Sequence, residues 1–108
     1  MSWNDWHRYS ERLAAEAETA RRDGAEDIAR RLFGDAAAAE EMALCCVDPA
    51  QTRTLGVTVV SCAWLMHKAG QGARASGFAQ QWIRSGRLPR FAVSDLQPLL
   101  GPPRRAPD

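Results

Sequence analysis

The chain has 108 residues, the usual size of a single domain, and its apolar share of 45% and charged share of 25% are ordinary for globular proteins. The chain contains no run of about 18 apolar residues, so no transmembrane helix is predicted. Its N-terminus lacks a basic segment followed by an apolar one, so no signal peptide is predicted. The three cysteines are odd in number, with Cys45 and Cys46 adjacent, and do not make a disulfide framework. We therefore expect a cytoplasmic protein. The abundance of alanine and arginine, with a single lysine, is typical of a GC-rich bacterial genome.

The net charge of +1 hides an asymmetry between the two halves of the chain. Residues 1–52 carry six arginines and eleven carboxylates, for −5, whereas residues 53–108 carry eight basic residues and two aspartates, for +6. Halves of opposite charge can attract one another within the molecule, guide self-association, or present a basic face to an acidic partner. The sequence leaves all three possibilities open.

Two long helices are predicted in the first half. The first covers residues 2–23, with Ser2 as its N-cap, Asp5 three residues later and Gly24 after its end. The second covers residues 25–46, where Gly34 allows a kink or a break, and its Glu40 lies away from the apolar stripe. The apolar stripes of the two helices step by three or four residues, and they are Trp6, Tyr9, Leu13, Ala17 and Ala20, then Ile28, Leu32, Ala36, Ala39 and Ala43.

The segment Asp48-Pro49-Ala50-Gln51 predicts the start of a third helix, with Asp48 as N-cap and Pro49 in the first turn. This helix runs to about residue 69 and is apolar nearly all round, so we expect it to be buried in the centre of the molecule. A two-residue joint leads to a fourth helix over residues 73–85, which ends at Gly86 and forms an antiparallel hairpin with the third. A short helix between residues 90 and 100 is expected to close the open end of this hairpin. Residues 101–108, with three prolines and two arginines, are predicted to be a disordered tail.

The expected fold class is therefore all-α, a bundle of four long helices plus a short closing helix in one domain over residues 1–100. From about residue 53 to residue 100, the chain resembles a tetratricopeptide-type antiparallel hairpin and the C-terminal stretch of small bacterial helical-repeat proteins. The residues that carry the resemblance are the small pair Cys62-Ala63, the turn residue Gly70, the small residue Ala75 and the pair Trp82-Ile83. The resemblance implies protein–protein recognition on a helical surface, and it supplies no catalytic residue.

No catalytic residue, cofactor site or metal site is predicted. A structural zinc site needs four well-placed ligands, and the two histidines and three cysteines show no such spacing. We expect His7 to be a solvated surface side chain and the three cysteines to be small buried thiols. Gly70-Gln71-Gly72 lacks the preceding strand of a phosphate-binding loop. We therefore predict that the protein is not an enzyme.

Tryptophans and arginines supply the candidate binding surface. Trp3 and Trp6 lie three residues apart at a terminus that would otherwise fray, and tryptophan is enriched at interface hot spots. The alternative is that both fold onto the end of the bundle. Trp64 and Trp82 are expected in the core, although Trp82 also lies beside a group of arginines. The candidate partner-binding residues are Trp3, Trp6, Tyr9, Trp82, Arg84, Arg87 and Arg90.

The leading interpretation of this sequence is a small adaptor, regulator or subunit of a bacterial complex that binds another protein. A nucleic-acid-associated protein that uses the basic C-terminal half is one alternative, and its binding would weaken steeply with salt. A homo-oligomer, in which the acidic half of one copy docks on the basic half of the next, is the other. No membrane partner is expected.

Overall fold

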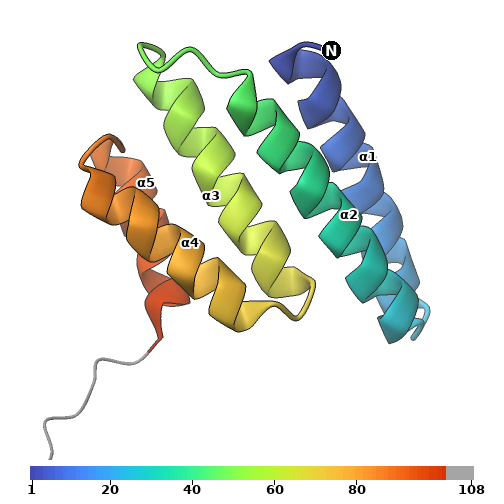
Figure 1. Ribbon diagram of the computed structural model, residues 1–108. Coiled ribbons are helices and arrows are strands. Elements are labelled where there is room, and N and C mark those ends of the chain that lie inside the picture. The colour runs from blue at the N-terminus through green and yellow to red at the C-terminus, as the bar shows by residue number, and fades with distance from the viewer. Residues whose placement is uncertain (102–108) are drawn as a thin grey trace, which may run out of the picture.

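The computed structural model describes residues 1–101, and these residues form helices and short connections (Figure 1). The helices are α1 (Trp3–Arg22), α2 (Glu26–Cys45), α3 (Thr52–Lys68), α4 (Gly72–Ser85) and α5 (Arg90–Leu96), and a 3-10 helix follows at Gln97–Leu100. The predicted fold class, four long helices plus a short closing one, is confirmed. The predicted disordered tail, apart from Gly101, lies outside the described residues.

Local signals in the sequence set several helix ends where they were predicted. At the start of α1, the Ser2 hydroxyl accepts a hydrogen bond from the Asp5 amide at 3.2 Å, and the Asp5 carboxylate accepts one from the Ser2 amide at 3.0 Å. This reciprocal pair is the capping box that satisfies two amides at a helix N-terminus. At the end of α4, Gly86 adopts a left-handed conformation with φ of +71°, which a side chain would oppose.

The predicted role of Asp48 as the N-cap of the third helix is wrong. The Asp48 carboxylate accepts a hydrogen bond from the Ala50 amide at 2.9 Å, and the Asp48 carbonyl accepts one from the Gln51 amide at 2.8 Å. These bonds close a turn of four residues, for which Asp at the first position and Pro at the second are favoured. The Asp-Pro signal is therefore used by this turn, and α3 begins at Thr52 without a side-chain cap.

The break that Gly34 would allow does not occur, because α2 is one uninterrupted helix of 20 residues. A Cβ atom at Gly34 would lie 3.8 Å from the Gln71 amide nitrogen, which is an ordinary contact distance. Gly34 thus faces the side chain of Gln71 in the connection between α3 and α4.

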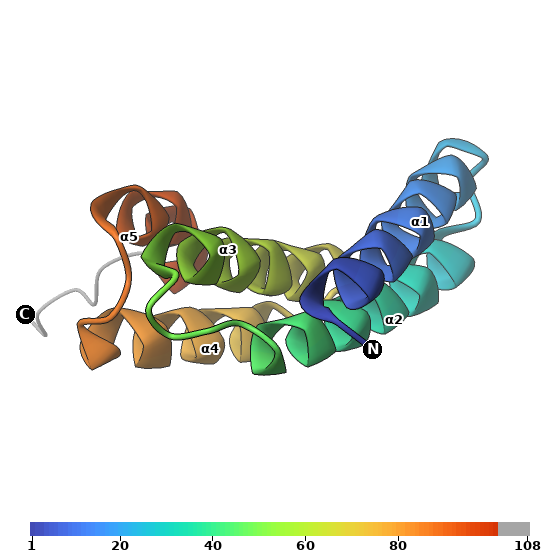
Figure 2. The ribbon, with the colours of Figure 1, turned by 90° about the horizontal axis from the view of Figure 1, so that it is seen from above.

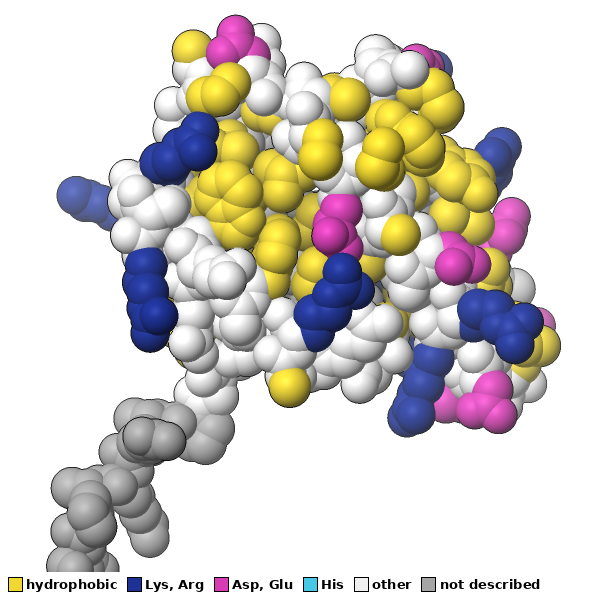
Figure 3. Space-filling model, in the orientation of Figure 1, with side chains coloured by type: hydrophobic (Ala, Val, Ile, Leu, Met, Phe, Trp, Pro, Cys, Tyr) yellow, Lys and Arg dark blue, Asp and Glu magenta, His cyan; other side chains and the backbone are white. Residues whose placement is uncertain are grey.

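The helices are arranged in two layers (Figure 2). α1, α3 and α5 lie in one layer, and α2 and α4 lie in the other. α2 packs against α1 and α3, whereas α4 packs against α3 and the C-terminal 3-10 helix. The Cα atoms extend over 44 × 40 × 17 Å, so the molecule is flat. α2 and α4 lie side by side in the same layer, with α3 behind the gap between them, and together they form one broad face of the molecule (Figure 3).

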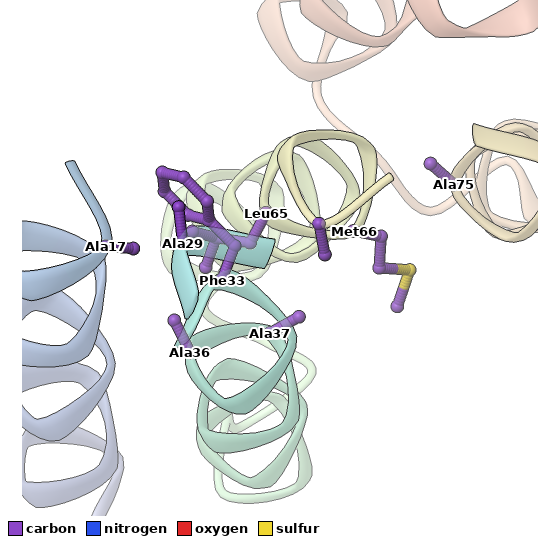
Figure 4. Close-up of a cluster of buried hydrophobic side chains, with 9 residues drawn as sticks. Ala17, Ala29, Phe33, Ala36, Ala37, Leu65, Met66 and Ala75 are labelled. Atoms are coloured by element: carbon purple, nitrogen blue, oxygen red, sulfur yellow. The ribbon is translucent and has the colours of Figure 1, made fainter. Parts of the chain in front are cut away.

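The core consists of two clusters, one on each side of the centre of α3. In the first, fully buried alanines of α1 and α2 let these helices approach closely, and Phe33 of α2 lies beside Leu65 of α3, whereas Met66 of α3 extends to the side of Ala75 of α4 (Figure 4). Arg21 and Lys68 cover the Phe33 ring, with the Arg21 Cζ 4.8 Å and the Lys68 Nζ 5.6 Å from its centroid. This contact joins α1, α2 and α3 at one end of the molecule.

The second cluster lies where the C-terminal segment covers α3 and α4, as the sequence predicted. Its buried members are Leu55, Val59, Ala63, Ala79, Leu96 and Leu99. Trp64 is half-buried, and its indole nitrogen donates a hydrogen bond to the Asp95 carbonyl at 3.1 Å, so this tryptophan anchors α5. Gly56 of α3 gives α5 room, because a Cβ atom there would lie 2.7 Å from the Pro89 ring.

Candidate protein-binding surface

The structure separates the two N-terminal tryptophans of the candidate set. Trp3 is half-buried, and its indole nitrogen donates a hydrogen bond to the Thr58 hydroxyl of α3 at 3.0 Å. Its ring also stacks on His7, with centroids 4.6 Å apart and an angle of 11° between the planes. Trp3 therefore ties α1 to α3 and belongs to the interior contacts of the fold.

Trp6 and Tyr9 instead open onto the face that α2 and α4 share. Together with Met42, Ala38 and Asp35 of α2, they line a shallow depression of about 400 Å³. Met42 is 46% exposed and Tyr9 is 39% exposed, and the Trp6 and Tyr9 rings lie 6.4 Å apart. Of the three N-terminal candidates, these two remain available to a partner.

His7 and Glu40 form a buried polar pair that the sequence did not predict. The His7 Nδ1 lies 2.8 Å from the Glu40 carboxylate, whose side chain is 1% exposed, and the His7 Nε2 lies 3.0 Å from Glu11. The expectation that His7 is solvated and Glu40 is turned away from the interior is therefore wrong. A buried carboxylate needs a partner because burial removes its hydration, and His7 provides it across the α1–α2 contact.

At the other end of the same face, Trp82 and Arg87 form the second candidate contact. Trp82 is half-buried beside Phe78, with ring centroids 6.4 Å apart, and the Arg87 guanidinium lies 5.9 Å from the Trp82 centroid. Trp82 and Arg87 line a second hollow, of about 270 Å³, with Gln81 and Ser85. The structure thus brings Trp82 and Arg87 of the candidate set together.

Arg84 and Arg90 do not join this contact. Arg84 is two residues from Trp82, which places it about 200° away around α4, on the solvent side. Arg90 is the first residue of α5, and the chain crosses from the layer of α4 to the other layer before reaching it (Figure 2). Of the C-terminal candidates, only Trp82 and Arg87 share one surface.

Between these two candidate contacts, α2 and α4 diverge from a closed end to an open one. At the closed end, the Arg74 guanidinium of α4 donates a hydrogen bond to the Glu41 carboxylate of α2 at 2.7 Å. Toward the open end, half-buried apolar side chains line the gap over α3, and Figure 3 shows apolar side chains gathered on this face on both sides of an ion pair. We call this surface the apolar strip, and its residues are Leu44, Val47, Phe78 and Trp82.

The charge left over after internal pairing lies in the C-terminal half. Lys68 and Arg74 pair with Glu18 and Glu41 of the acidic half, so the two halves are complementary at two places. In residues 1–101, no ion pair shorter than 4.0 Å involves Arg53, Arg84, Arg87 or Arg90. No aspartate or glutamate occurs between residues 49 and 94. Residues 49–94 therefore contain no carboxylate that could neutralise the four arginines without an ion pair.

The cysteines differ from the expectation of three buried thiols, because Cys45 and Cys46 are exposed and only Cys62 is buried. Burial, with smaller contributions from the Glu40 and Glu41 carboxylates, raises the pKa of the Cys62 thiol far above its ordinary value. Within residues 1–101, no group of three or more His, Cys, Asp or Glu side chains is placed to hold a metal ion. None of the described helices is long and apolar enough to span a bilayer.

Fold and surface together define an all-α protein of two helical layers, with an apolar strip that leads to an arginine. No family model, no curated protein and no solved structure matches this chain.

Proposed function

We propose that this protein is a non-enzymatic protein-binding module, acting as an adaptor, regulator or small subunit of a bacterial complex in the cytoplasm. One observation carries the proposal: the apolar strip lies on an open face of the molecule beside Arg87, and no described element of the chain covers it. Apolar and aromatic side chains next to arginine are the composition of protein-binding hot spots.

The packing of the helices supports the proposal. α1, α3 and α5 line one layer and α2 and α4 the other, so consecutive helices alternate between the layers (Figure 2). Tetratricopeptide-like proteins, which the second half of the sequence resembles, use alternating helices to present an extended binding surface. We extend the resemblance to this chain as part of the proposal.

The experiment is a pull-down with the tagged full-length protein from its native cell lysate, with and without nuclease. Two variants accompany the wild type: Trp82→Ala in the apolar strip, and Ile28→Ala as a control, because Ile28 is an apolar side chain of α2 that is 56% exposed outside the strip. We expect a stoichiometric protein partner that survives nuclease, persists with Ile28→Ala and is lost with Trp82→Ala. Circular dichroism establishes that both variants remain folded.

A second candidate function, nucleic-acid binding, is favoured by the positive charge between residues 49 and 94. Recovery of nucleic acid alone, removed by nuclease and by raised salt, would replace the first proposal with this one. Recovery of nothing but further copies of the chain would favour the homo-oligomer.

A further inference from the structure

The shape of the apolar strip indicates what kind of segment it accommodates. Phe78 and Trp82 of the strip follow Arg74 at four-residue spacing along α4, and this row runs from the Arg74–Glu41 ion pair toward Arg87. Eight residues of helix extend about 12 Å, so roughly two turns of a partner helix cover the strip. A row of side chains at this spacing is the ridge against which another helix packs.

The charge at the open end of the strip indicates which residue the segment carries. The Arg87 guanidinium lies over the Trp82 ring on an exposed residue, and it forms no ion pair within residues 1–101. At the closed end, Arg74 at the boundary of the strip already has a carboxylate partner in Glu41. A carboxylate on the bound segment would accept a charge-assisted hydrogen bond from Arg87, as Glu41 accepts one from Arg74.

A second copy of the chain fits this site less well than another protein. The carboxylates of α1 and of the first half of α2 alternate along the sequence with arginines at positions 8, 12, 21, 22, 30 and 31. This part of the acidic half therefore presents both signs of charge. A nucleic acid would use the positive charge but would leave the apolar side chains of the strip without a matching surface.

We propose that the apolar strip binds an amphipathic α-helical segment of another protein, with its apolar face on Phe78 and Trp82 and a carboxylate paired with Arg87. This inference rests on the proposed function and adds the chemistry of the partner to it. Helices that lie in apolar grooves are recognised through side chains at positions i, i+3 or i+4, and i+7. The partner segment is expected to show that spacing, with Asp or Glu at the end that meets Arg87.

The test is the selection of binders to the immobilised full-length protein from a display library of random 16-residue peptides. The expected consensus has helical apolar spacing and one or two carboxylates at one end. Fluorescence anisotropy with an enriched, labelled peptide then compares charge reversals at three exposed arginines. We expect Arg87→Glu to weaken binding roughly tenfold, since it replaces an attraction by a repulsion next to an apolar contact. Arg84→Glu on the far side of α4, and Arg31→Glu on α2, should each change it less than about threefold.

Two further measurements distinguish the outcomes. Trp82→Ala, checked for folding by circular dichroism, should weaken binding of the peptide roughly thirtyfold, as expected for a hot-spot aromatic. Peptides that lack carboxylates, or that respond equally to Arg84→Glu and Arg87→Glu, would overturn the inference while leaving a protein-binding function intact. Peptides that depend on Trp6 and ignore Trp82 would do the same. A library that yields no binder, together with self-association in sedimentation or binding of labelled nucleic acid, would overturn both the inference and the proposed function.

Discussion

Gly56 gives the sharpest prediction about how α3 meets the C-terminal segment. A Cβ atom at this position would lie 2.7 Å from the Cγ and 2.9 Å from the Cδ of Pro89, and 3.1 Å from the Cζ of Phe91. Pro89 has a rigid ring and is the N-cap of α5, so backbone as well as side-chain atoms must shift to admit a methyl group. Gly77 of α4 is the matched control, because nothing lies within 4 Å of a Cβ atom there.

The magnitudes follow from two opposing effects. Replacing a glycine inside a helix by alanine favours the folded state by about 1 kcal/mol, and this gain applies to both positions. Overpacking costs roughly 1–3 kcal/mol, and this cost applies to Gly56 alone. We expect Gly77→Ala to raise the melting temperature by about 4–8 °C, and Gly56→Ala to leave it unchanged or to lower it by up to about twice that amount.

Thermal unfolding followed by circular dichroism measures both changes. The double variant Gly56→Ala/Pro89→Ala removes the ring atoms that clash, so it should recover stability relative to the two single variants added together. If Gly56→Ala raised the melting temperature as much as Gly77→Ala does, α5 could not pack against α3 as described.

Three further predictions concern the buried and capped polar groups. His7→Ala leaves the Glu40 carboxylate buried without a partner, and should lower the free energy of unfolding, measured with urea, by about 3–5 kcal/mol. The Ser2 amide and hydroxyl hold the pKa of Asp5 below its ordinary value, so its stabilising contribution is present above about pH 4 and is lost as the pH falls; Asp5→Asn should therefore lower the melting temperature at pH 7 and much less at pH 2. A thiol reagent should react quickly with the two exposed cysteines and with Cys62 only after unfolding, because Cys62 is buried with a raised pKa.

The first of these predictions has a control in the same helix, and each has an outcome that would contradict it. Glu11 is the exposed carboxylate on the other side of His7. Its replacement by glutamine should lower the free energy of unfolding by less than about 1 kcal/mol. An equal loss from His7→Ala and Glu11→Gln would show that the Glu40 pair is not buried. For Asp5→Asn, a difference in melting temperature that persisted undiminished at pH 2 would contradict the capping role. Fast labelling of three thiols in the native protein would contradict the burial of Cys62.

Much of the fold could be predicted from the sequence because its signals are local. The capping box of Ser2 and Asp5 and the left-handed turn at Gly86 each involve residues close in sequence. Asp48 shows the limit of such signals, since Asp followed by Pro suits a turn as well as a helix start. In the structure, Asp48 accepts hydrogen bonds from the amides of Ala50 and Gln51, so it forms the turn. Both of these residues precede the first residue of α3, Thr52.

The candidate surface could be predicted only in part, because it depends on which helices become neighbours. Trp3 and Trp6 have the same residue type, the same helix and nearly the same face, yet Trp3 bonds to Thr58, 55 residues away, while Trp6 faces Met42. Glutamate is a residue type that usually faces solvent, and the burial of Glu40 becomes possible because His7 contacts it across the α1–α2 interface. His7 is 33 residues away in the sequence. The periodicity of a helical sequence gives the angle of a side chain around its own helix, but not which residue of another helix it contacts.

The same reasoning explains why the C-terminal arginines do not act as one group. Arg84, Arg87 and Arg90 are evenly spaced in the sequence, and an uninterrupted helix would have placed them on one side, three residues apart. Gly86 ends α4 between the first and the second, and Pro89 is the N-cap of α5 before the third, so the three arginines do not lie on one helix. The turn residues that close the fold thus leave Arg87 alone beside Trp82, and the helical segment that we propose as the ligand would need only one carboxylate at that end of the apolar strip.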